Sequence, residues 1–218
     1  MPKAFEKNHF IWLTLALIGL LISGAISREI SSNLTLQLLE FTSIALLMLS
    51  LLSFKTNHRW IKTFVIILAI MLATVIVRGV TKFPAAEYFY LGLMLAFLLT
   101  AAWLVAHQVL LTGSIDFNKI IGAVALYLML GLIWSIFYVI LLEFSPLALK
   151  GIEAGNWYDN LPSTTYFSFV TLTTLGYGDI SPVKPIAEVL VILEAVLGMF
   201  YLAVIVASLI GAYTVTRK

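Results

Sequence analysis

The chain contains no cysteine and few charged residues, and each shortage excludes a class of protein. Without cysteine among its 218 residues, the chain can form no disulfide, thiolate metal site or thiol redox centre. Charged residues make up 11% of the total, whereas soluble domains usually have about 25%. The formal net charge of +2 gives no reason to expect a nucleic-acid partner. Because 61% of the residues are hydrophobic and the mean hydropathy is +1.05, we expect a membrane protein.

Six segments are apolar and long enough to cross a membrane as helices, which takes about 17–25 residues. They are Phe10–Ile26, Leu36–Phe54, Ile61–Val77, Tyr88–Ala106, Ile120–Leu142 and Pro185–Ala212. The predicted fold class is therefore an all-α membrane protein with six transmembrane helices. The first segment also resembles a signal peptide, with Ser23 and Ala25 as a cleavage site. Because it is longer than the usual apolar region of about 7–15 residues, we expect this segment to be retained.

The stretch between the fifth and sixth segments, Glu143–Lys184, has a different character. It begins with polar and turn-forming residues and continues with a short run, Ser163–Thr173, which cannot cross a bilayer as a helix. Glycine-containing backbone follows. A half-length helix followed by such backbone predicts a re-entrant loop, which is tolerated at membrane depth only where protein buries it or water lines it.

The distribution of lysine and arginine predicts the orientation of the six segments. Both termini fall on one side, together with most of the basic residues, namely Lys3, Lys7, Lys55, Arg59, Lys62, Lys119, Arg217 and Lys218. The side of the re-entrant loop has fewer, namely Arg28, Arg78, Lys82, Lys150 and Lys184. Since basic loops stay in the cytoplasm, we expect both termini to be cytoplasmic and the loop to enter from outside.

Residues Thr173–Asp179 read TTLGYGD, and this pattern suits the binding of a dehydrated potassium ion. Such an ion needs stacked rings of backbone carbonyls in place of its water shell. Carbonyls of successive residues can face one axis if φ alternates in sign, and glycine reaches positive φ without steric cost. Gly176 and Gly178 supply that freedom, and Thr174 can add its hydroxyl. The side chains of Leu175 and Tyr177 would then point away and pack behind the carbonyls.

The same residues closely resemble the signature of potassium channels, with Leu175 where the family commonly has valine. The resemblance extends over Ile120–Ala212. It implies the pore architecture of voltage-gated-like ion channels, with an outer helix at 120–142, a pore helix at 162–173, a filter at 174–178 and an inner helix at 185–212. The preceding spans resemble the family's peripheral domain only in number and hydropathy. The chain is thus predicted to have a peripheral domain at 1–113 and a pore domain at 114–218.

Within this family the chain looks most like small prokaryotic six-span channels. The resemblance implies a homotetramer surrounded by lipid in a prokaryotic cell membrane. It implies no cofactor, and potassium is expected as the permeant ligand at Thr174, Leu175, Gly176 and Tyr177. We call Thr174–Gly178 the filter segment from here on.

Residues around the filter segment have predicted supporting roles. Tyr166, Phe167 and Thr173 would support it from the pore helix, while Asp179, with Asp159 as a second candidate, would concentrate cations at the outer mouth. An ordinary solvated carboxylate is the alternative for each aspartate. Pro162 suits the first turn of a helix, and we expect Asn160 or Asp159 to cap it.

The inner helix carries three further predictions. Glu194 lies inside an apolar run, where carboxyl groups are costly and usually face protein or water, so we expect it to form hydrogen bonds behind the pore helix. Gly198 falls at the position of the family's gating hinge, although close helix packing explains a membrane glycine equally well. By resemblance, the cavity and inner gate are lined by Met199, Leu202, Val206 and Ile210. Contact with lipid or another helix is the alternative for these four, because every face of the helix is apolar.

The first four segments lack the charges of a voltage sensor. Such a sensor moves about 3–4 charges per subunit, yet Tyr88–Ala106 contains no lysine or arginine. We therefore expect a channel that is not voltage-gated, and the sequence identifies no gating ligand or partner. Glu40 and Arg78 either pair as in a sensor-like domain or are two unrelated charges near the membrane surface.

Three other functions fit parts of the sequence. Intramembrane aspartyl proteases use Tyr-Asp and Gly-x-Gly-Asp motifs, which occur here as Tyr158-Asp159 and Gly176–Asp179. Their two aspartates come from separate spans, whereas both lie in one loop here, so we expect no enzyme. A potassium transporter needs four pore loops in one chain, and this sequence has one. A modulatory subunit that does not conduct is the third alternative.

Overall fold

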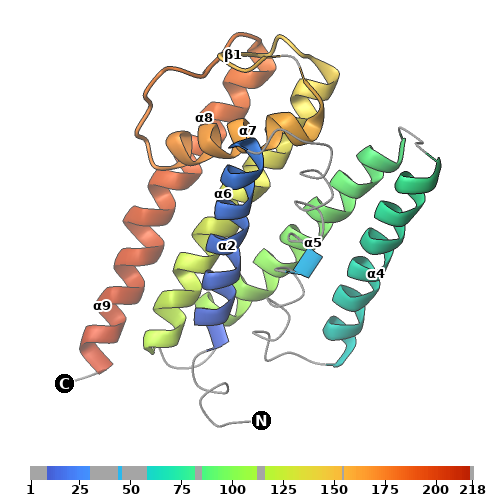
Figure 1. Ribbon diagram of the computed structural model, residues 1–218. Helices are drawn as coiled ribbons and strands as arrows, with labels where there is room; N and C mark the ends of the chain where they lie inside the picture. The colour runs from blue at the N-terminus through green and yellow to red at the C-terminus, as the bar shows by residue number, and fades with distance from the viewer. Residues whose placement is uncertain are drawn as a thin grey trace. The chain divides into compact units, whose positions relative to one another are not determined.

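The computed structural model describes residues 9–29, 44–45, 58–81, 85–111, 116–153 and 155–216, which are mostly helical (Figure 1). The chain divides into two compact units, Met1–Leu128 and Met129–Lys218. The boundary between these units falls inside a helix. The predicted division into a peripheral domain and a pore domain between residues 113 and 114 stays a prediction.

Four helices among the described residues are long and apolar enough to cross a membrane. Their apolar spans are Trp60–Val77, Ala86–Leu110, Phe117–Phe144 and Pro185–Val206. The first predicted span, Phe10–Ile26, is observed as a shorter apolar helix. The second, Leu36–Phe54, lies almost wholly outside the described residues.

Unit 1 contains α2 (His9–Glu29), α4 (His58–Thr81), α5 (Ala85–Leu110) and the first part of α6 (Phe117–Phe144). One stripe of α4 is buried, formed by Phe64, Leu68, Met71 and Val75. Their spacing of three and four residues places them on one helix face. The rings of Phe64 and Phe97 pack edge to face with their centroids 5.1 Å apart. Much of the remaining surface of α4 is exposed and apolar, as suits a lipid-facing helix.

The first helix is tied to α6 by a hydrogen bond between residues far apart in sequence. The backbone N–H of Phe10 donates to Oδ1 of Asn118 over 3.2 Å. This satisfies a donor at the start of α2 that has no partner within the helix. Gly122 permits the close approach, because a Cβ there would lie 2.7 Å from both the Phe10 ring and Val109. α2 is therefore an integral part of unit 1.

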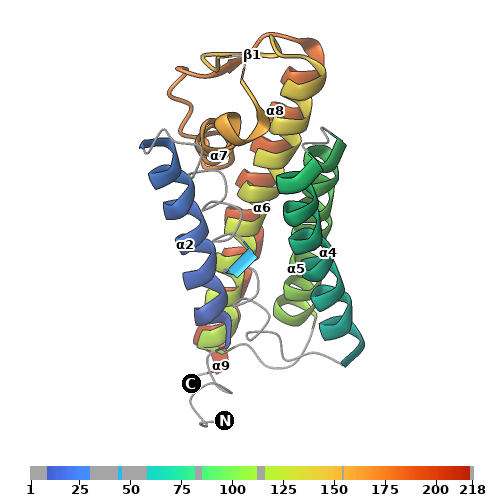
Figure 2. The same cartoon turned by 45° about the vertical axis from the view of Figure 1, so that its right-hand side comes forward.

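Unit 2 contains the rest of α6, then β1 (Leu149–Lys150), α7 (Trp157–Leu172), β2 (Ser181–Pro182) and α8 (Pro185–Phe200). A π-helix, η1 (Tyr201–Val206), and α9 (Ala207–Thr216) continue α8. The short helix α7 lies at the end of this unit where α6 ends and α8 begins, close to β1 (Figure 2).

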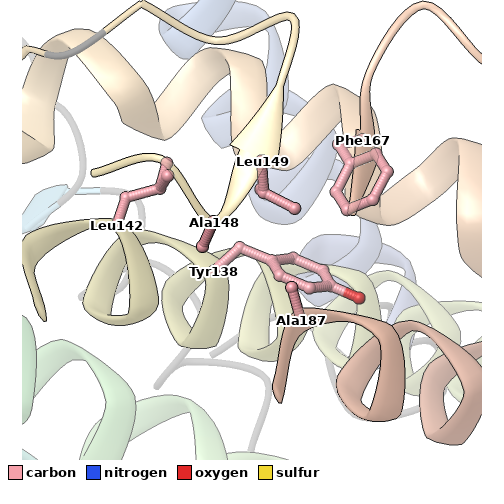
Figure 3. Packing of buried hydrophobic residues seen from close by; sticks show 6 residues of the cluster. All are labelled: Tyr138, Leu142, Ala148, Leu149, Phe167 and Ala187. Atoms are coloured by element: carbon pink, nitrogen blue, oxygen red, sulfur yellow. The ribbon is translucent and has the colours of Figure 1, made fainter. Parts of the chain in front are cut away.

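A buried apolar cluster joins α6, β1, α7 and α8 (Figure 3). It consists of Tyr138, Leu142, Ala148, Leu149, Phe167 and Ala187. The rings of Tyr138 and Phe167 pack edge to face at 4.9 Å between centroids, an arrangement favoured by the aromatic quadrupole. This core fixes α7 between the two long helices of unit 2.

The two strands connect the loop after α6 to the segment that follows the filter. They pair antiparallel, with Leu149 opposite Pro182 and Lys150 opposite Ser181. Gly151 follows β1 with φ at +91°. A Cβ on Gly151 would collide with the backbone carbonyl of Asp179. Glycine is thus required here both by its backbone angle and by the nearness of the chain just past the filter segment.

The predicted start of the pore helix was wrong. We expected the helix at 162–173 with Pro162 in its first turn, whereas α7 covers Trp157–Leu172 and Pro162 lies inside it. The earlier start is stabilised by burial of Trp157, which is 1% exposed. The helix accommodates the proline although its ring nitrogen has no hydrogen to donate to the preceding turn.

The predicted capping residues also act differently. The N-cap of α7 is Asn156, whose side chain makes no capping hydrogen bond. Its carbonyl instead accepts the N–H groups of Asp159 and Asn160, at 3.0 and 3.1 Å. The side chain of Asn160 donates to the carbonyl of Gly155 over 3.0 Å. Both residues therefore belong to the first turn rather than to the cap.

Candidate functional site

The filter segment is attached to the last turn of α7 by backbone hydrogen bonds. The N–H of Thr174 donates to the carbonyl of Thr171 over 2.9 Å. The N–H groups of Leu175 and Gly176 both donate to the carbonyl of Val170, at 2.9 and 3.3 Å. These bonds satisfy carbonyls that a helix end leaves unpaired. They also place the start of the filter segment at the negative end of the helix dipole, which favours a cation.

Every second residue of the filter segment has a positive φ angle. The values are +59° at Thr174, +57° at Gly176 and +80° at Gly178. Positive φ was predicted for the two glycines but not for Thr174. A side chain in this conformation costs about 1–2 kcal/mol, so Thr174 is strained. A Cβ on Gly176 or Gly178 would meet no atom within 4 Å, and their backbone angles alone therefore require glycine.

The side chains of the filter segment are uncovered in the single chain. Leu175 is 55% exposed and Tyr177 is 67% exposed. We expected both to pack behind the backbone, yet within the described part of this chain neither becomes buried. Any dense packing around them must come from outside the described residues of one chain.

The two neighbouring aromatic residues of α7 are placed differently. The hydroxyl of Tyr166 donates to Oδ2 of Asp179 over 2.8 Å, and this hydrogen bond raises the pKa of Tyr166 above its usual value of 10. Phe167 instead faces the core cluster, where it is 4% exposed. The aromatic contact with the residue that follows the filter segment therefore comes from Tyr166. Thr173, the C-cap of α7, donates its hydroxyl proton to the carbonyl of Phe169 over 2.6 Å.

Glu194 of α8 is fully buried and lies behind α7. Its Oε1 is 2.5 Å from the Oγ of Ser168 on α7, and its Oε2 accepts the hydroxyl proton of Tyr138 on α6 over 2.6 Å. Ser168 also lies 2.8 Å from the carbonyl oxygen of Gly131. One carboxyl group thus connects three helices, α6, α7 and α8.

Two glycines allow α7 to approach its neighbours closely. A Cβ on Gly198 of α8 would collide with the backbone carbonyl of Leu172 at the end of α7. A Cβ on Gly131 of α6 would lie 2.6 Å from the ring of Phe169. The geometry therefore gives Gly198 a packing role next to the filter segment, and its role as a hinge stays a prediction.

The helical interruption in the inner segment lies beyond Gly198, in η1. A π turn contains an extra residue, and each residue of an α-helix turns the chain by about 100°. Residues after η1 are therefore rotated relative to an uninterrupted α-helix. Met199, Leu202 and Ile210 are about half exposed, and Val206 is less so. Which of these four residues line a conduction path stays a prediction.

The remaining candidates are peripheral or outside the described residues. Asp159 is exposed in the first turn of α7, where a carboxylate suits the positive end of the helix dipole. Glu40 lies outside the described residues, and the side chain of Arg78 is not described. Within the described ranges, no three His, Cys, Asp or Glu residues are grouped to hold a metal ion.

Several residues around the site were not singled out from the sequence. Ser168 and Tyr138 lie in apolar segments, and their only signal was that a buried glutamate needs donors nearby. The roles of Gly131 and Gly151 depend on which segments meet in the fold, so no local pattern indicated them. The π-helix contains no proline or glycine, and nothing in its sequence distinguishes it from an α-helix.

Comparisons with known proteins agree with this geometry. Residues 123–215 match the family model described as ion channel. The inward rectifier potassium channel Kirbac3.1 of Paramagnetospirillum magnetotacticum is 53% identical over 47 residues, which are 22% of this chain and 16% of that protein. The chain thus matches only a small share of this relative's length. No solved structure gives a significant match.

The match to the family model begins within α6 and ends within α9, so it includes α7, the filter segment and α8. The apolar helices of this region are those of a membrane protein. Residues 123–215 are therefore similar to an ion channel domain, and the two comparisons together support a place for the chain in the potassium channel superfamily.

Proposed function

We propose that the chain is one subunit of a homotetrameric channel that conducts potassium passively and selectively across a prokaryotic cell membrane. The observation that carries the proposal is the alternation of positive φ at Thr174, Gly176 and Gly178, directly after the 16-residue helix α7. Alternating backbone of this kind allows successive carbonyls to face one axis, as potassium coordination requires.

The exposure of Leu175 and Tyr177 supports the fourfold assembly. One chain supplies a single filter segment, and a closed ring of carbonyls around an ion needs several copies related by cyclic symmetry. Leu175 and Tyr177 are 55% and 67% exposed in the single chain, which leaves their surface available for contact with neighbouring copies. In a tetramer the neighbouring subunits would cover them, and lipid would surround the outer helices.

The orientation follows from the basic residues. The bias of lysine and arginine toward the side of the termini favours cytoplasmic termini and an external filter segment. Tyr166 and Asp179 would then lie at the outer mouth, where the carboxylate attracts cations. Members of an ion channel family catalyse no reaction, so the paired motifs of an aspartyl protease have no role in this proposal.

Potassium flux out of liposomes tests the proposal directly. Purified chain reconstituted into potassium-loaded vesicles should release potassium with a valinomycin-independent flux, and replacing potassium by sodium should reduce the flux at least about tenfold, as a filter of fitted carbonyl rings predicts. Light scattering combined with size-exclusion chromatography should give the mass of four chains in detergent. Equal sodium and potassium permeability would refute the selectivity, and a dimer or trimer as the only species would refute the assembly.

The same assay separates the proposal from its rivals. A modulatory subunit would form an oligomer but give no flux alone. A transporter would give a flux that saturates at low potassium and depends on a coupled ion, whereas a channel conducts without one.

A further inference from the structure

Glu194 lies in a row of hydrogen-bonding groups, and the number of protons in the row determines whether every contact can be a hydrogen bond. Three oxygen–oxygen contacts join four groups in a row. They are Tyr138 Oη to Glu194 Oε2 at 2.6 Å, Glu194 Oε1 to Ser168 Oγ at 2.5 Å, and Ser168 Oγ to the Gly131 carbonyl oxygen at 2.8 Å. Each contact is short enough to be a hydrogen bond, and each hydrogen bond needs one proton.

An ionised glutamate leaves this row one proton short. The Tyr138 hydroxyl and the Ser168 hydroxyl supply one proton each, and the carbonyl of Gly131 can only accept. If Ser168 donates to Gly131, two lone-pair-bearing oxygens of Ser168 and Glu194 face each other at 2.5 Å. If Ser168 donates to Glu194, the same conflict arises at Gly131. A protonated Glu194 removes the conflict, because its own proton completes the row.

We infer that Glu194 is a neutral carboxylic acid whose proton, donated to Ser168, positions the filter-bearing helix α7 against α6 and α8. The row then runs in one direction: Tyr138 donates to Glu194, Glu194 donates to Ser168, and Ser168 donates to Gly131. Glu194 is a positioning residue in this scheme, since it touches neither the filter segment nor an ion. Its consequence for conduction rests on the proposed function, whereas its protonation does not.

The surroundings of Glu194 suit a neutral acid. The glutamate is 0% exposed, and burying a carboxylate without a cation is very costly. Among the described residues, the groups that face it are the hydroxyl of Tyr138 from α6 and that of Ser168 from α7. Neither is a cation, and no described lysine, arginine or histidine pairs with Glu194. The nearest other acid along the same helix, Glu188, is exposed.

The inferred proton makes the stability of the assembly depend on pH. An unfolded chain releases this proton near the ordinary pKa of glutamate, about 4.3, whereas the folded chain keeps it to higher pH. Stability therefore falls as pH rises above that value, as long as the folded state binds more protons than the unfolded state. Glutamine at position 194 would reproduce the row, with its carbonyl accepting from Tyr138 and its amide donating to Ser168, and it would carry no titratable proton.

Infrared spectroscopy tests the protonation without reference to conduction. The difference spectrum between wild type and Glu194→Gln at neutral pH should contain the carbonyl band of one protonated carboxylic acid per chain, which shifts on isotopic labelling of glutamate. The control, Glu188→Gln, should leave this band in place. A carboxylate band in the Glu194 difference spectrum would overturn the inference, whatever the flux of either protein.

Variants test the positioning role. Glu194→Ala leaves the hydroxyl of Tyr138 without its acceptor and that of Ser168 without its donor, and we expect at least about a tenfold loss of potassium flux together with a less stable oligomer. Glu194→Gln should restore both flux and stability and should abolish the fall of stability with rising pH that this glutamate causes. Wild-type stability that depends on pH no more than that of the glutamine variant, or a glutamine variant as impaired as alanine, would contradict the inference. Absence of flux in wild type would refute the proposed function but leave the infrared result valid.

Discussion

The hydroxyl of Tyr166 donates a hydrogen bond to Asp179 over 2.8 Å, so that helix α7 holds the filter segment at both of its ends. Backbone bonds to the carbonyl of Val170 fix the first end. Asp179 directly follows Gly178, so its bond to Tyr166 fixes the second. The pairing of β1 with β2 and the close approach of Gly151 to Asp179 restrain the same second end.

Replacing Asp179 should lower the pKa of Tyr166. The hydrogen bond to Asp179 is the largest cause of the raised pKa of this tyrosine, since the protonated hydroxyl donates to the carboxylate. The stabilisation is thus fully present at neutral pH and is lost as pH rises through the folded pKa. Titration of tyrosinate absorbance should show one tyrosine ionising at lower pH in Asp179→Asn than in wild type.

Tyr166→Phe identifies which tyrosine is responsible. This variant should lack the tyrosinate signal that responds to residue 179. Adding Asp179→Asn to it should therefore shift no tyrosinate signal in the titration. A signal that still shifts in the double variant would show that Asp179 acts on another hydroxyl, such as that of Tyr177.

Gly176→Ala should abolish conduction although space is available for the methyl group. The obstacle is φ at +57°, at which a side chain costs about 1–2 kcal/mol. In a tetramer four copies would add, for a total of about 4–8 kcal/mol. Thr174 has a similar φ in each copy, so the strain at position 176 would add to the strain already present at Thr174. Potassium flux from vesicles is the measurement.

Gly92→Ala is the matched control for this change. Gly92 lies in α5, and a Cβ there would also meet no atom within 4 Å, but its φ is not positive. We expect its flux to be unchanged and its helix to be slightly stabilised, by up to about 1 kcal/mol. Equal loss of flux in both variants would show that the positive φ of Gly176 is not the cause.

Gly198→Ala should destabilise the oligomer. Its Cβ would collide with the Leu172 carbonyl, and overpacking of this kind costs about 1–3 kcal/mol. Gly211→Ala in α9, where a Cβ meets nothing within 4 Å, should not. The temperature at which the detergent-solubilised oligomer dissociates measures the difference. A hinge role without a packing role predicts the opposite pattern, with altered flux and unchanged stability.

The sequence contained enough information to locate the pore region but not to describe its supports. Hydropathy and the order of residues from Thr173 to Asp179 predicted a half-length helix and a glycine-dependent backbone, because both are local properties. The start of α7 was misplaced because Pro162 is a strong local signal, whereas burial of Trp157 depends on the fold. Likewise, a carboxyl at Glu194 predicted a hydrogen-bonding partner, but only packing determines that Ser168 and Tyr138 provide it.

The last prediction is that opening depends only weakly on voltage. Each elementary charge that crosses the whole membrane field contributes about 2.3 kcal/mol per 100 mV, and steep gating needs several charges per subunit. The helix expected to move them, α5, carries Glu87 in its first turn and His107 in its last, with no lysine or arginine between them.

The basic residues of α4 do not compensate for this lack. Arg59 and Lys62 lie in its first turns and Arg78 in its last, so that these charges lie at the ends of the helix. Such charges cross little of the field when a helix moves. Recordings from planar bilayers at strongly negative and strongly positive potentials should therefore show a gating charge of about one elementary unit or less per channel. Several units per channel would mean that α4 and α5 move charges through the field, and it would require a voltage-sensing role for the first unit.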